Sequence, residues 1–236
     1  MKLKLKKKPK GVTIIEGFPG FGLVGTITTE FLVEHLKAEI IGNFMFEEMP
    51  SIVAIHESKL VHPMGIYYDK KYNLLIFHMV TTTQGYEWKV SEALVDLAKE
   101  LKAKELISVE GVGASSPLTE EKAFYFANHA KGKKKFEKIG VTPLKEGIIM
   151  GVTAALLLEV GNIPMSCIFA DTHSQFPDSK AAARVIEILD KYLGLKVDTA
   201  PLLKQAEKFE EKIKGLLQQS SIARSQQEKK MMSYVG

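Results

Sequence analysis

The clearest spacing for chemistry is shown by three glycines, Gly20, Gly22 and Gly25, which stand in the order G-x-G-x-x-G. An apolar segment expected to be a strand precedes them, and a segment expected to be a helix follows. In that setting, glycines can let a pyrophosphate approach the backbone amides at a helix N-terminus, which would indicate dinucleotide binding. The alternative is a tight apolar turn whose glycines permit contact between helix and sheet. We favour the turn, because Pro19 lacks an amide hydrogen and two aromatic rings crowd the phosphate position.

A second group of polar residues lies at expected strand ends. Asp171 and His173 follow one apolar segment, and Ser115 and Ser116 follow a glycine-rich turn. Open α/β sheets commonly place their sites at strand ends, and a Ser-His-Asp set could be assembled from these residues. However, neither serine stands in a G-x-S-x-G elbow. We therefore expect no catalytic residues and no enzyme, with a nucleoside- or nucleotide-handling enzyme built on these residues as the alternative.

The chain has six histidines and one cysteine, Cys167. No H-x-x-x-H pair and no pair of cysteines is present, so we expect neither a metal nor another cofactor. Cys167 lies within an apolar segment and is interpreted as an inert core thiol. A lone cysteine also excludes an internal disulfide framework and fits a reducing cytosol, so we expect a cytoplasmic protein.

The last residues of the chain combine an aromatic ring, apolar side chains and a terminal carboxylate. Such an end suits insertion into a pocket on another protein that reads the ring and the carboxylate together. The candidate partner-binding residues are Met232, Ser233, Tyr234, Val235 and Gly236.

Apolar runs expected to be strands alternate along the chain with segments expected to be helices. This alternation predicts an α/β fold of three layers, in which helices cover both faces of a parallel or mixed sheet. The segment 147–160 is apolar on most sides, so we expect a helix packed between layers. The expected strands are 12–16, 39–46, 51–56, 65–68, 73–79, 105–109 and 163–170, and the expected helices are 26–36, 86–101, 147–160 and 179–192.

The balance of charged residues bears on which classes of partner the protein could bind. The net charge of +4 comes from 32 Lys and Arg against 28 Asp and Glu, which argues against nucleic-acid binding. No apolar run approaches the roughly 20 residues that span a bilayer, so we expect no membrane contact.

Residues 2–6 alternate Lys and Leu as in a protected edge strand, although a ragged cationic end is the alternative. The Lys-rich segment 131–135 is interpreted as a solvated loop, and Trp88 as a packing residue.

We expect an α/β domain at 1–198, an amphipathic helical extension at 199–230 and a C-terminal tail at 231–236. Apolar residues in the extension repeat at steps of four and three, which is heptad spacing. This seam would organise an oligomer and present the tails, or would rest on its own domain. Its residues are Leu202, Ala206, Phe209, Ile213 and Leu216.

Several segments together resemble the proteasome assembly chaperone family, in particular its archaeal homologues. Residues 16–25, with the sequence EGFPGFGLVG, resemble the opening signature of that family, and residues 108–113 and 145–158 are similar to two further family segments. The resemblance covers approximately residues 11–193. The residues that carry the opening signature are Gly17, Phe18, Pro19, Gly20, Gly22 and Gly25.

The resemblance implies a fold similar to purine nucleoside phosphorylases without their enzymatic site. It also implies a homo-oligomer, with a tetramer favoured, that binds the proteasome α-subunit ring through its C-terminal tails without ATP. The role would be assembly chaperone or activator. Proteasome activators commonly end in a hydrophobic residue, Tyr and any residue, whereas Tyr234 here is third from the end and Val235 is the penultimate residue.

Overall fold

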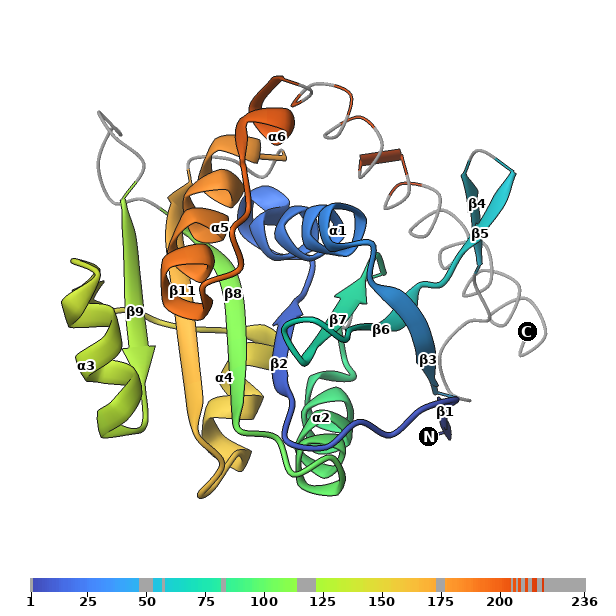
Figure 1. The fold of residues 1–236 in the computed structure, drawn as a ribbon, viewed down its shortest axis with the longest axis horizontal. Helices are drawn as coiled ribbons and strands as arrows, with labels where there is room; N and C mark the ends of the chain where they lie inside the picture. The colour runs from blue at the N-terminus through green and yellow to red at the C-terminus, as the bar shows by residue number, and fades with distance from the viewer. Residues whose placement is uncertain are drawn as a thin grey trace, which may run out of the picture.

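The computed structural model describes residues 2–46, 53–56, 58–81, 84–113, 122–172 and 177–204, with residues 206, 208, 211, 214, 215 and 218 beyond them. Within these residues, nine strands form one mixed sheet in the order β1-β3-β6-β7-β2-β8-β11-β9-β10. Helices cover both faces of this sheet (Figure 1). The predicted three-layer α/β fold is therefore confirmed.

The strands of the sheet are β1 (Lys2–Leu5), β2 (Thr13–Gly17), β3 (Glu39–Met45), β6 (Met64–Asp69), β7 (Leu74–Met79), β8 (Glu105–Gly113), β9 (Ala123–Ala127), β10 (Thr142–Pro143) and β11 (Met165–Thr172). A separate antiparallel pair, β4 (Ala54–His56) and β5 (Lys59–Val61), projects from the body in Figure 1. The helices are η1 (Phe21–Leu23), α1 (Val24–Leu36), α2 (Glu87–Glu100), α3 (Ala130–Lys138), α4 (Gly151–Glu159), α5 (Ser179–Leu193) and α6 (Ala200–Lys204).

Four neighbouring strands in the middle of the sheet, β7, β2, β8 and β11, run parallel. Their registers include Ile15 opposite both Ile76 and Ile107. Antiparallel strands extend the sheet on both sides, with β1 at one edge, as the Lys-Leu alternation predicts. Because the central strands are parallel, their carboxyl ends meet at one edge, which we call the carboxyl edge.

Alternation along the central strands divides the interior into two cores. Ile15 and Ile107 face the layer formed by α1 and α5. Ile14 and Leu106 face the opposite layer, in which α2 packs against α4. Each central strand is buried on both faces, which is the environment that near-continuous apolar strands require.

Four expectations are corrected by the structure. Strand β8 continues through Gly113 instead of ending in a turn, because residues 106–113 pair with β11. The lysine-rich segment forms helix α3, anchored on the buried ring of Phe136. The side chain of Trp88 is 56% exposed and is not a packing residue within this chain. Helix α4 begins at Gly151, and the exposure of Leu158 shows that the helix is not covered on both sides.

Among the described residues, no helix combines the length and apolar character needed to cross a membrane.

Candidate functional site

The glycine-rich segment brings helix α1 into backbone contact with the sheet. A Cβ atom added to Gly17 would lie 2.3 Å from the carbonyl oxygen of Gly25. One added to Gly25 would lie 2.6 Å from the carbonyl oxygen of Val109 on β8. Both distances are impossible for a real side chain, so glycine is required at these positions for the close approach of α1 to β2 and β8.

The other end of the same segment is attached to helix α5. Gly22 has a φ of +60°, in the left-handed region that favours glycine, and its carbonyl accepts a hydrogen bond from the amide of Asp178 at 2.8 Å. The Thr172 hydroxyl donates to the Asp178 carboxylate at 2.8 Å. The turn, the end of β11 and the start of α5 therefore form one connected unit.

The aromatic residues of the segment differ in their surroundings. The ring of Phe18 is buried, with its centroid 5.8 Å from that of Phe77, whereas Phe21 is 44% exposed. The glycines contact protein atoms and serve helix–sheet packing, as the tight-turn interpretation predicts.

Two carboxylates lie beneath this turn, on adjacent strands and on the α4 side of the sheet. Glu16 on β2 is fully buried, and neither of its carboxylate oxygens has a hydrogen-bond partner among the described residues. Glu110 on β8 has one enclosed oxygen, Oε2, that likewise has no partner there. The hydroxyls of Ser108 and Thr153 lie 2.9 Å apart and join strand β8 to the first turn of α4. A polar layer thus interrupts an otherwise apolar core.

Burial controls the ionisation of both acids. Desolvation raises the pKa of Glu16 well above its ordinary value, and the nearby Glu110 carboxylate raises it further, while Ser108 opposes the shift in part. Desolvation also raises the pKa of Glu110 from 4.5 to about 7, against an opposing hydrogen bond from Thr153. Burial therefore favours the protonated form of Glu16, and the pKa of Glu110 lies near neutral pH.

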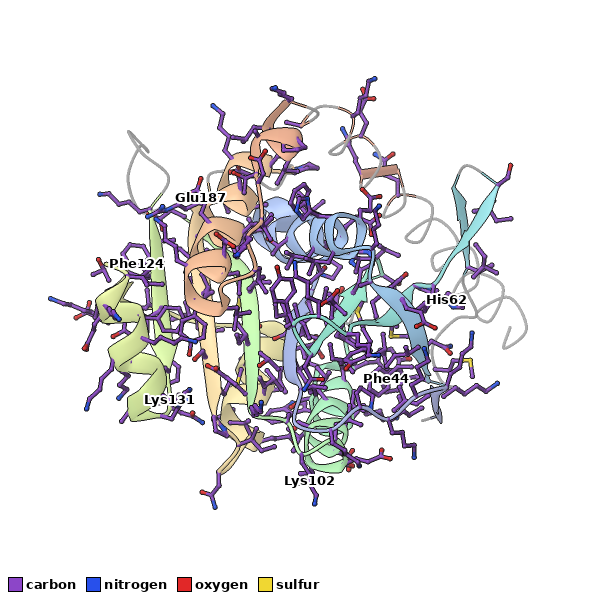
Figure 2. The ribbon with its side chains drawn as sticks, viewed as in Figure 1. Phe44, His62, Lys102, Phe124, Lys131 and Glu187 are labelled. Carbon is purple, nitrogen blue, oxygen red and sulfur yellow. The ribbon has the colours of Figure 1, made fainter. Side chains whose placement is uncertain are left out.

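A hollow of about 440 Å³ opens at the carboxyl edge, beside the ends of β8 and β11. This volume falls in the range of sites that hold a small ligand or a side chain. Asp171 lines the hollow together with Lys145 and Ile148 from the segment that leads into α4. Phe124 on β9, also in its lining, marks this side of the molecule in Figure 2.

Of the four residues considered for catalysis, the structure describes one. Asp171 lies at the hollow, whereas Ser115, Ser116 and His173 fall outside the described residues. Within the described part of the chain, no three His, Cys, Asp or Glu side chains are grouped so that they could hold a metal ion. The Cys167 thiol is buried, and its pKa is raised well above the ordinary value by desolvation, so it is an unreactive core group, as predicted.

The predicted seam begins on the domain itself. Leu202 is buried in the core beside α5, and Ala206 is half-buried. Phe209, Ile213 and Leu216 lie outside the described residues, as do the candidate partner-binding residues Met232, Ser233, Tyr234, Val235 and Gly236.

Sequence reasoning missed the paired carboxylates. The available signal was a repeated dipeptide, because Glu16-Gly17 and Glu110-Gly111 each stand at the end of an apolar run. An acid inside an apolar strand is informative, since Glu is rarely fully buried without a partner.

Comparison with known proteins gives a family and a set of similar folds. The profile of the PAC2 family matches residues 14–217. The crystal structure of Pyrococcus furiosus PbaA, "an archaeal homolog of proteasome-assembly chaperone", is 30% identical, with a TM-score of 0.84 over 94% of this chain and 99% of that chain. Pyrococcus furiosus PbaB, "an archaeal proteasome activator", is 23% identical and shares the fold, with a TM-score of 0.74 over 91% of this chain and 98% of that one.

A curated relative covers the same length. An uncharacterized protein of Methanocaldococcus jannaschii is 25% identical over 234 residues, which are 98% of this chain and 96% of the relative. These comparisons confirm the family resemblance that residues 16–25 indicate.

Proposed function

Because this chain belongs to the PAC2 family, we propose that it is an ATP-independent proteasome assembly chaperone or activator that works as a homo-oligomer in the cytoplasm. Its partner is the proteasome α-subunit ring, and its C-terminal residues make the contact. The observation that carries this proposal is the 30% identity to PbaA across 94% of the chain. The chaperone-type character of that relative also supports a binding role over an enzymatic one.

The proposed contact depends on several tails acting together. A terminal peptide of a few residues buries too little surface to offset the free-energy cost of association by itself. Tails that belong to one oligomer reach the ring at a high effective concentration, which raises the overall affinity by about 10²–10⁴. The oligomer is therefore part of the binding mechanism.

The length of the C-terminal segment suits this mechanism. Residues 219–236 would span at most about 65 Å if fully extended, at up to 3.6 Å per residue. Such a reach allows tails from several copies to engage separate pockets around a ring. The terminal residues Tyr234 and Val235 would enter the pocket, with the carboxylate of Gly236 paired to a basic group.

Deletion of residues 232–236 tests the proposal. The truncated chain should lose co-elution with purified proteasome α-rings, while its circular dichroism and light-scattering mass remain those of the full chain. A full-length control carries the same five residues in scrambled order, which preserves length and composition. Loss of binding in both variants supports recognition of the terminal sequence. Undiminished co-elution of the truncated chain with α-rings would show that the tail is not the contact.

A further inference from the structure

Helix α4 has apolar residues on two opposite sides. Val152, Thr153, Ala155 and Leu156 are buried and face the sheet and α2. A second set, separated by steps of four residues, faces outward, which is the spacing of a continuous helical stripe. Its members are Met150, Ala154 and Leu158, of which Ala154 is half-buried, whereas the half-buried Leu157 packs against the same core as Leu156.

The outward stripe joins an apolar segment just before the helix, and together they form what we call the α4 face. Its largest side chains are strongly exposed in the single chain, with Ile148 at 90%, Leu158 at 76% and Met150 at 62%. Burying one such side chain stabilises a protein by about 2–3 kcal/mol, which corresponds to about 100 Å² of apolar surface. These three side chains together therefore present roughly 300 Å² of apolar surface. A helix that is apolar on all sides is normally buried on all sides.

We propose that the α4 face is an interface between two copies of this chain, related by a two-fold axis, with their α4 helices packed antiparallel. This inference rests on the proposed homo-oligomer and adds the surface and the geometry. An apolar area of about 300 Å² per copy supplies more than a third of the roughly 800 Å² that each partner buries in a standard interface. The polar rim of the same face supplies the rest.

Charge favours the antiparallel arrangement. Lys145 and Glu159, both exposed, stand on either side of the apolar residues, one before the helix and the other at its end. Antiparallel packing brings the end of the face that carries Lys145 in each copy toward the end that carries Glu159 in the other. Parallel packing would place like charges together, which is destabilising. Gly151 and Ala154 between them are small, so that two helices can approach closely.

A second copy fits this face better than the proteasome ring. The apolar stripe contains no charge between residues 147 and 158, and a face of that kind is typical of permanent interfaces between identical subunits. The proposed ring contact instead uses the C-terminal residues. Covering the α4 face also accounts for the apolar character that the sequence shows on all sides of this helix.

Two charge substitutions test the interface. Leu158→Glu and Ile148→Glu each place a carboxylate on the α4 face, one near either end, and each should lower the mass measured by light scattering after size exclusion. The expected effect is an increase of at least about 10-fold in the dissociation constant between copies. Ile148 precedes the helix and is 90% exposed, so Ile148→Glu leaves the fold of one chain intact. Ile55, 70% exposed on the projecting hairpin, gives the matched control Ile55→Glu, which should keep the parent mass.

The geometry has its own test. Lys145→Glu and Glu159→Lys should each weaken self-association, whereas the double variant should recover it because the charge pairs are restored in reverse. A double variant weaker than both single variants would contradict the antiparallel arrangement. A parent chain that runs as a single copy, or interface variants with unchanged mass, would overturn the interface itself.

Failure of the interface can be told apart from failure of the proposed function. If the full chain binds α-rings and loses them on removal of residues 232–236, the tail mechanism stands whatever the mass of Leu158→Glu. If the mass of Leu158→Glu falls while truncation leaves ring binding unchanged, the interface stands and the tail mechanism fails.

Discussion

At the scale of single residues, the paired carboxyl groups of Glu16 and Glu110 are the feature that most clearly disfavours folding. Glu16 and Glu110 face the same side of neighbouring strands, in a core otherwise built from apolar side chains. An ionised carboxylate without partners is strongly disfavoured in such a place, so burial keeps the proton on it. The polar layer therefore makes stability depend on pH.

The direction of this dependence follows from the raised pKa of Glu110. The folded chain holds the proton up to a pH of about 7, whereas the unfolded chain releases it near 4.5. Between these values the folded state binds more protons, so stability falls as pH rises and levels off above 7. The loss is about 3 kcal/mol from this group.

Glu110→Gln removes the titration. We expect the variant to melt at a higher temperature than the parent at pH 8, with a much smaller difference at pH 5. Glu146→Gln, at an exposed position in the segment before α4, serves as the control and should follow the parent curve. Parallel melting curves for parent and Glu110→Gln from pH 5 to 8 would show that the carboxyl is not buried in this way.

At the scale of elements, helix α5 depends on a single capping residue. The Asp178 carboxylate accepts a hydrogen bond from the amide of Ala181 at 3.0 Å and another from the hydroxyl of Thr172. One bond caps the helix, and the other joins it to the end of β11. The same residue therefore stabilises the helix and fixes its position on the sheet.

Asp178→Ala removes both bonds and should lower the free energy of unfolding by about 1–2 kcal/mol. For a chain of this length, the melting temperature should fall by about 2–8 °C. Asp178→Asn keeps an acceptor oxygen for the amide of Ala181 and should recover most of that loss. Equal melting temperatures for the parent and the Ala variant would show that the cap is dispensable.

Elements with a regular apolar pattern could be predicted from the sequence. The helix starting after Asp178, the hairpin of β6 and β7 and the edge strand β1 all carry such patterns and are confirmed. Helix α3 could not be predicted, because its sequence AKGKKKFEK contains one large apolar residue, Phe136. Its N-terminus is capped by the ring nitrogen of His129, which is not among the usual capping residues.

Helix α4 shows a different limit of prediction from the sequence. Its residues predict burial on every side, and the single chain provides only one covering layer. Periodicity reports which side chains avoid water, and it does not report whether the covering surface comes from the same chain. The glycine segment was interpretable because Pro19 and its aromatic neighbours conflict with phosphate binding. The pairing of the buried Glu16 with the half-buried Glu110 instead depends on tertiary packing.

At the scale of the whole molecule, the proposed function needs two separate surfaces. The α4 face would hold copies together, and the C-terminal residues 232–236 would reach the proteasome ring. Self-association multiplies the weak contact of each tail, so loss of the oligomer should weaken ring binding by about 10²-fold or more even when every tail is intact.

Electron microscopy of the intact protein mixed with purified proteasome α-rings would image the proposed complex itself. We expect an oligomer seated on the face of the ring, with density from the C-terminal residues entering pockets between α-subunits. Bare rings beside unbound protein, at concentrations where the oligomer is intact, would contradict it.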